Sequence, residues 1–308
     1  MSTGPDGRKD RIMTENIKKE SENTDVAATV PHGAKRIPTW WDIVVVLLVF
    51  VLSQGAAVAL CHLFGVEGAD MNAASDDNAA EAAAYVQGRY VAIMYFISMS
   101  VCLPLLWYYK GLRGWSVRLP FRAPGWASPF RLLCGYVLLW CVTIAVEPLT
   151  SKLPGNQSML GGGGWLLVSA AILAPIFEET VFRGYIAGAL RSAYGGVAAW
   201  IWSALIFGAV HVVPSVAVNA ALCGLVLGFY YLRYRSLVLV ILLHAMNNLT
   251  ACFLRTMGLG DMTMREAVAN EGLYTAIYAA CVTVCVMAAA RMFRLLRRVK
   301  GDNSPATE

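Results

Sequence analysis

Five ionisable side chains with catalytic potential lie inside long apolar stretches of this 308-residue chain. Glu178, Glu179 and Arg183 interrupt the run WLLVSAAILAPIFEETVFRGYIAGAL, and two histidines, His211 and His244, lie in later apolar runs. A charged side chain within hydrocarbon costs about 2.5–3.5 kcal/mol on insertion scales, so each such residue needs a local reason. These residues are therefore the first candidates for function.

Helical spacing divides the first group into a pair and a single acid. Glu179 and Arg183 are four residues apart, so they share one helix face, with the acid in the favourable N-terminal position. We expect a buried ion pair that supports the site. Glu178 is turned about 100° away on an α-helix, and no residue near it in the sequence can neutralise it. The spacing thus predicts that Glu178 is the acid that does chemistry.

Each histidine has a partner four residues away. Phe207 precedes His211 in FGAVH, and Asn248 follows His244 in HAMNN. Residues at this spacing face the same way on a helix. We expect Glu178, His211, His244 and Asn248 to form one catalytic site, with Phe207 as a supporting ring.

This set of groups is suited to hydrolysis. A carboxylate and an imidazole can hold and deprotonate a water molecule, and a histidine with a side-chain amide can stabilise an oxyanion. Amide hydrolysis then needs no serine or cysteine nucleophile. Two histidines and a carboxylate are also the ligand set of a catalytic zinc, although the HExxH pattern is absent. Zinc held by Glu178, His211 and His244 therefore stays open as an alternative.

The composition indicates the elements that must position these residues. The chain is 57% hydrophobic and 15% charged, with a mean hydropathy of +0.55, and its apolar residues form blocks of roughly 17–25, enough to cross a bilayer as helices. We predict an all-α, polytopic membrane protein of about eight transmembrane helices with an intramembrane polar site. The expected spans are about 41–64, 90–109, 131–149, 165–190, 196–213, 216–232, 237–254 and 272–293.

Basic residues are divided unequally between the two ends of these spans. With alternating spans, 20 of the 25 lysines and arginines lie on one side, which the positive-inside rule assigns to the cytoplasm. We expect both termini to be cytoplasmic, the protein to lie in the plasma membrane, and the site to open to the cytoplasm. The segregated charge favours the lipid bilayer as a partner and argues against nucleic acid.

The same pattern predicts four regions along the chain. They are a disordered cytoplasmic tail (1–39), a membrane region of three spans (40–164), a core that carries all the candidate site residues (165–255), and a last span with a basic cytoplasmic tail (256–308).

The ordered motifs EExxxR (178–183), FxxxH (207–211) and HxxxN (244–248) resemble the CAAX protease and bacteriocin-processing family, which includes the type II CAAX prenyl endopeptidases and the bacterial Abi proteins. The resemblance covers about residues 165–255. It implies an intramembrane endopeptidase in which Glu178 and His211 activate water and His244 with Asn248 stabilises the oxyanion. It also implies a peptide or membrane-associated protein as substrate, prenylated in some members. The family is commonly labelled a metalloprotease, while the prenyl endopeptidases look metal-free.

Two other functions are compatible with the same residues. Buried glutamate and histidine also carry protons in coupled transporters, although no pair of Gly/Pro-broken spans marks a transport site here. A non-catalytic scaffold of the same fold, such as an immunity partner, would keep the helices without the reaction.

Overall fold

The computed structural model describes residues 37–70, 76–115, 117–122, 128–154, 161–260 and 262–298. These residues belong to one compact unit that begins at Ile37. They form helices and contain no β-strand. The predicted cytoplasmic tail lies outside the described residues, except for its last three positions.

Seven helical segments of the described chain are long and apolar enough to cross a membrane. Six are single helices: α2 (Trp40–Leu63), α3 (Asp77–Arg113), α4 (Ser128–Thr150), α8 (Pro214–Tyr234), α9 (Leu237–Thr256) and α11 (Glu271–Leu296). The other is a composite of α5 (Gly163–Leu166), η2 (Leu167–Leu173), α6 (Ala174–Glu178), η3 (Glu179–Ala187) and α7 (Gly188–Ala209). A short helix, α10 (Met264–Val268), precedes α11.

A break at Gly195 explains why seven segments correspond to eight predicted spans. The composite segment runs over 47 residues, but Gly195 has a φ of 83°, which is not helical. Glycine adopts positive φ at little cost because it has no Cβ. The helical arms before and after Gly195 correspond to the predicted spans 165–190 and 196–213. The all-α, polytopic fold class is confirmed.

The second span begins earlier than predicted. We expected a loop as far as residue 89, but α3 starts at Asp77, where the Asp76 side chain caps the helix by accepting a bond from the Ala79 amide (2.8 Å). The alanine-rich stretch that follows favours helix. With 37 residues, α3 is about 55 Å long, so its acidic beginning extends past the roughly 30 Å of hydrocarbon.

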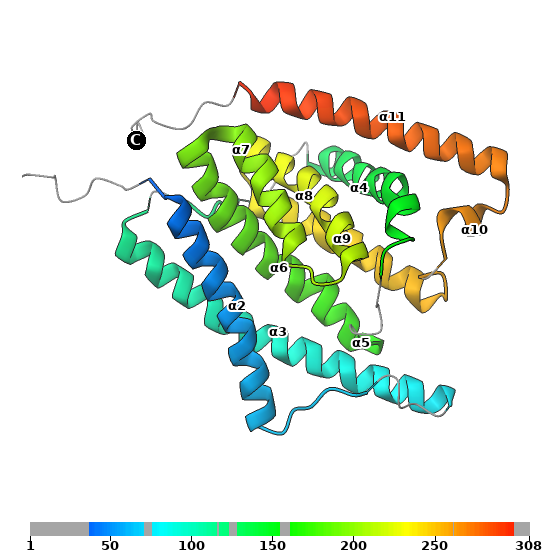
Figure 1. Cartoon of the computed structure of the whole chain (residues 1–308), viewed down its shortest axis with the longest axis horizontal. Coiled ribbons are helices and arrows are strands. Elements are labelled where there is room, and N and C mark those ends of the chain that lie inside the picture. Colours follow the sequence, from blue (N-terminus) through cyan, green and yellow to red (C-terminus); the bar gives the residue numbers. More distant parts are fainter. Residues whose placement is uncertain are drawn as a thin grey trace, which may run out of the picture. The chain divides into compact units, whose positions relative to one another are not determined.

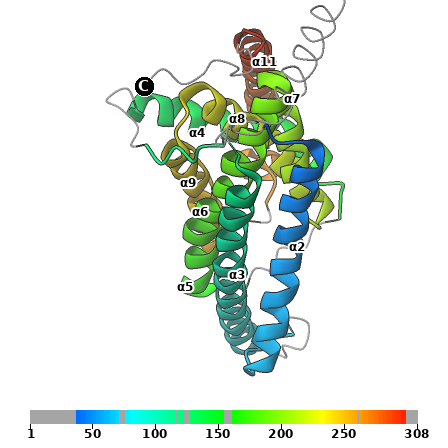
Figure 2. The ribbon, with the colours of Figure 1, turned by 90° about the vertical axis from the view of Figure 1, so that its left-hand side faces the viewer.

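Polar contacts join the helix ends at one end of the bundle, which we call the basic face. The buried Asp42 carboxylate on α2 accepts bonds from Tyr109 (2.7 Å) and Arg113 (2.9 Å) near the end of α3. The Ser236 hydroxyl, at the turn between α8 and α9, donates to the Arg122 carbonyl (2.7 Å). Figure 2 shows α2 running alongside α3.

The opposite helix ends meet at what we call the acidic face, after Asp77, Glu81, Glu147 and Glu266. The Gly162 amide before α5 donates to the Ala84 carbonyl near the start of α3 (2.8 Å). The Ser215 amide at the start of α8 donates to the Pro154 carbonyl after α4 (3.3 Å), and the Met264 amide of α10 donates to Glu147 of α4 (2.6 Å).

The composite segment lies inside the bundle, and α11 lies at its edge. Every residue of η3 is buried, whereas only 6% of the apolar window of α11 is buried. α11 packs chiefly against α4 (Figure 1). The core thus surrounds the segment that carries Glu178, Glu179 and Arg183.

Helices α7 and α8 pack closely at Gly208. A Cβ atom there would lie 2.6 Å from the Cβ of Ala221 and 2.7 Å from the Ala217 carbonyl oxygen. Only a glycine allows this approach without displacement of α8. The contact fixes the depth of His211, which follows three residues later.

We predict that Gly208→Ala lowers stability and that Gly55→Ala does not. In α2, a Cβ at Gly55 meets no atom within 4 Å, so that variant gains about 0.5–1 kcal/mol from helix propensity alone. Overpacking at Gly208 costs about 1–3 kcal/mol. Thermal unfolding of both purified proteins in the same detergent measures the difference. Equal midpoints would contradict the close α7–α8 contact.

Candidate active site

A change of helix type separates the two adjacent glutamates. Glu178 is the last residue of α6 and Glu179 the first of η3, a π-helix of nine residues. A π-helix bonds residue i to i+5 and is wider than an α-helix, and such turns are frequent at functional sites. The sequence analysis assumed regular α geometry here, so the π-helices η2 and η3 are features it did not predict.

The predicted ion pair of Glu179 and Arg183 is present and has a third member. One oxygen of Glu179, Oε1, accepts from Arg183 Nη1 (3.0 Å) and from His244 Nδ1 (2.9 Å). Glu179 and Arg183 are fully buried. Arg183 also donates to the Gly224 carbonyl (3.3 Å) and lies over the Phe207 ring at 4.2 Å. The pair therefore holds a histidine of another helix, which sequence spacing did not indicate.

Glu178 has its partners on other helices. Its Oε1 accepts from the Tyr95 hydroxyl of α3 (2.8 Å). Its Oε2 lies 4.0 Å from His244 Nε2, too far for a direct hydrogen bond. A water molecule bound between these two atoms would contact both groups. Tyr95 was missed because a tyrosine in an apolar span is usually a packing residue, and no spacing linked it to Glu178.

The formal charges of this cluster are one proton short of neutrality. Glu178 and Glu179 carry two negative charges, and Arg183 carries one positive charge. A net charge in a low-dielectric site is costly. His244 and Glu178 are the two groups that face the 4.0 Å gap, so they are the groups of this cluster that a water molecule in the gap would contact.

His211 lies on the other side of Phe207. Its Nδ1 is 2.7 Å from the Phe207 carbonyl oxygen. Because a carbonyl oxygen only accepts, Nδ1 carries the hydrogen, and in the neutral ring Nε2 is left as an acceptor. The Phe207 ring contacts His211 edge-on (centroids 5.0 Å apart) and His244 likewise (6.0 Å). Phe207 therefore stands between the two imidazoles.

Asn248 connects α9 to the widened first part of the composite segment. Its amide nitrogen donates to the Ala170 carbonyl of η2 (2.8 Å), and its oxygen accepts from Asn247 (3.5 Å). One hydrogen of the Asn248 amide remains for another acceptor.

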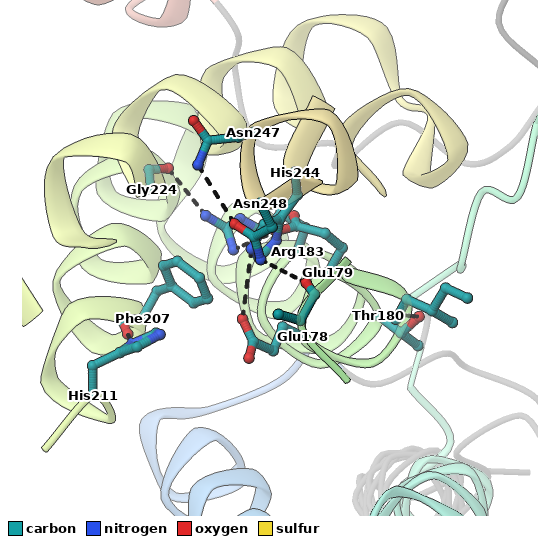
Figure 3. A network of polar contacts seen from close by, with 12 residues as sticks. Glu178, Glu179, Thr180, Arg183, Phe207, His211, Gly224, His244, Asn247 and Asn248 are labelled. Atoms are coloured by element: carbon teal, nitrogen blue, oxygen red, sulfur yellow. Dashed lines mark hydrogen bonds and ion pairs between the residues drawn. The ribbon is translucent and has the colours of Figure 1, made fainter. Parts of the chain in front are cut away.

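All four predicted catalytic residues line one cavity of about 500 Å³. Glu178, His211, His244 and Asn248 come from α6, the α7–α8 junction and α9, and Figure 3 shows them near one another around Phe207. Tyr95 also lines the cavity, whereas Glu179 and Arg183 lie behind it. The remaining lining is mostly apolar.

Residues 161–250 match the family model described as Rce1-like, the type II CAAX prenyl endopeptidases. This part of the chain is similar to the CAAX proteases. The match confirms the resemblance predicted from the three motifs, and it supports an intramembrane protease of CAAX type that acts on a peptide or protein in the membrane. No curated protein and no solved structure matches the chain.

The region similar to the CAAX proteases contains every predicted site residue but excludes Tyr95. The hydroxyl that contacts Glu178 is thus contributed by a helix outside the match. Seven membrane-length helices in the described chain agree with a multi-pass membrane protein.

The predicted zinc ligands do not converge in this structure. Among the described residues, no group of three or more histidine, cysteine, aspartate or glutamate side chains is arranged to hold a metal ion. Phe207 separates His211 from His244. The residues in this arrangement do not fit a three-ligand zinc site, so we derive no step through a metal.

We predict that Arg183→Met destabilises the fold, because it leaves Glu179 buried without its guanidinium. Removing one partner of a buried pair costs roughly 3–5 kcal/mol, and a Glu179→Gln/Arg183→Met double variant should recover part of that loss. Arg265→Met is the control, since it breaks an exposed pair with Glu271 (2.8 Å), and exposed pairs contribute little to stability. Thermal unfolding in detergent compares the variants, and a loss no larger for Arg183→Met than for Arg265→Met would contradict the buried pair.

Proposed function

We propose that the chain is an intramembrane endopeptidase in which Glu178 activates the hydrolytic water. The observation that carries this proposal is the position of Glu178 at the cavity wall, bonded to Tyr95 through one oxygen and facing His244 across 4.0 Å with the other. Glu179, by contrast, is bonded on the far side of the wall and accepts from Arg183 and His244. Glu178 is thus accessible to a molecule in the cavity, whereas Glu179 is not.

The first step is attack by water on the scissile carbonyl. A water molecule between Glu178 and His244 transfers its proton to Glu178 Oε2 as its oxygen bonds to the carbonyl carbon. The bond from Tyr95 holds the carboxylate, so that the second oxygen points to the cavity. Positioning of this kind raises the rate because the reacting atoms need not be brought together in the transition state.

The tetrahedral intermediate then carries a negative oxygen that needs donors. His244 donates from Nδ1 to the Glu179 carboxylate, which fixes the orientation of the ring, and when the ring is protonated its Nε2 can donate to the oxyanion. Asn248 has one remaining amide hydrogen. Donors aimed at a developing oxyanion are often the largest contribution to such a reaction.

Collapse of the intermediate breaks the C–N bond. The proton held by Glu178 passes to the leaving nitrogen, and the products are a carboxylic acid and an amine, so atoms balance with one water consumed. His211, whose Nε2 is an acceptor in the neutral ring, lines the same cavity and is placed to orient the water or the peptide N–H. We assign His211 this orienting role.

The cavity supports a peptide as substrate. Its volume of about 500 Å³ and its mostly apolar lining with a few polar groups lie within the range of ligand-binding pockets, and such a pocket can receive the few residues around a scissile bond. The match to prenyl endopeptidases supports a test with prenylated and unprenylated peptides side by side.

We predict that Glu178→Gln lowers kcat for peptide cleavage by about 10²–10⁴-fold, the range of a general base, without lowering thermal stability. Cleavage of a prenylated peptide and its unprenylated counterpart by purified protein measures this, with one arm in chelator. Activity that chelator removes and zinc restores would replace the water mechanism by a metal one. An active Glu178→Gln protein would remove Glu178 from the chemistry, and a Glu178-dependent proton flux in liposomes would favour transport.

We also predict that Tyr95→Phe lowers kcat by about 10- to 150-fold with KM nearly unchanged, since a hydrogen bond to a charged group is worth about 1.5–3 kcal/mol. Tyr85→Phe is the matched control, because Tyr85 lies on the same helix and is half exposed. A positioning role requires a changed pH profile of kcat in Tyr95→Phe. A variant with native kcat and native pH profile would refute it.

A further inference from the structure

The exposed part of the cavity wall lies at the acidic face. Val212, in the junction between α7 and α8, is 94% exposed, and Val216 in the first turn of α8 is 39% exposed. Both line the cavity, together with the exposed Ala251 and with Arg255 in the last turn of α9. The same junction contacts the chain after α4 through Ser215, which belongs to the acidic face.

The wall toward the basic face is closed. Leu139, Leu227, Phe207 and His244 line the cavity and are buried. Along the arm of the composite segment before Gly195, lining residues occur from Leu166 to Glu178 and then stop. The next nine residues, η3, are all buried and continue toward Gly195 and the basic face. The cavity is therefore a cleft that opens at the acidic face and ends at Glu178.

The charge distribution orients the two faces. The basic face contains the ends of α3 and α8 with Arg113 and Arg233, and most lysines and arginines of the described residues lie toward it, among them Lys110, Arg122, Arg235 and Arg297. The positive-inside rule places that side in the cytoplasm. The cavity then opens to the non-cytoplasmic side. Cytoplasmic termini and a cytoplasmic opening, both expected from the sequence, cannot hold together.

We propose that the cavity receives peptide segments from the non-cytoplasmic side of the membrane, so that the substrates are exported or membrane-anchored proteins cut on that side. The cleavage itself rests on the proposed function, whereas the side of access rests on the cavity and the charges alone. A protein whose processed end stays in the cytoplasm has no path to Glu178 in this orientation.

Labelling of two single cysteines tests the side of access. Val212→Cys lies at the mouth, and Arg233→Cys is its matched control at an exposed position of the basic face. The full-length variants, and the native chain as background for its eight cysteines, are treated with a membrane-impermeant maleimide in spheroplasts and in inside-out vesicles of the expressing bacterium. We expect at least tenfold more labelling of Val212→Cys in spheroplasts and of Arg233→Cys in inside-out vesicles. The reverse pattern, or labelling of both from one side, would overturn the inference.

Cleavage from each side separates this inference from the proposed function. A fluorogenic peptide that cannot cross the membrane is added to spheroplasts and, separately, to inside-out vesicles, with Glu178→Gln as the blank. We expect cleavage in spheroplasts only. Cleavage confined to inside-out vesicles would contradict access from the non-cytoplasmic side and would still support the proposed endopeptidase function. If the cysteines are labelled as expected but no cleavage occurs on either side, access from the non-cytoplasmic side is supported and the proposed endopeptidase function is contradicted.

Discussion

The site depends on one buried carboxylate oxygen that is shared by two hydrogen-bond donors. Glu179 Oε1 accepts from Arg183 and from His244, and neither Glu179 nor Arg183 has any exposed surface. A buried ion pair stabilises a fold little compared with apolar residues of the same volume, yet removing one partner is very costly. Its value here is positional, since it ties η3 to α9 and sets the ring of His244 beside Glu178.

The two adjacent glutamates therefore have opposite environments, although they are neighbours in the chain. Glu179 faces into the protein and is held by charge, while Glu178 faces the cavity and is held by the neutral hydroxyl of Tyr95. The change from α6 to η3 occurs between them. Because a buried, ion-paired acid and a cavity-facing acid are adjacent in the chain, the same helix supplies both the support and the candidate base.

Residue spacing predicted the contacts within one helix but not the contacts between helices. The Glu179–Arg183 pair, the span positions and the gathering of Glu178, His211, His244 and Asn248 around one cavity follow from four-residue periods and apolar blocks. The bond from Tyr95, the bond from His244 to Glu179, and the contact of Asn248 with η2 depend on helix packing, which a single sequence does not encode in any local pattern. The early start of α3 was missed because hydropathy marks only the part of a helix that lies in lipid.

Phe207 has a consequence for the movement of protons. Its ring lies between His211 and His244, and its face is covered by the Arg183 guanidinium. Hydrocarbon transfers no proton, so the two imidazoles are insulated from each other and cannot relay directly. A proton that leaves His244 for His211 has to travel through whatever fills the cavity, either solvent or the polar groups of a bound peptide. The path for the proton between the two histidines would then be provided by the solvent or peptide in the cavity and not by the side chains around it.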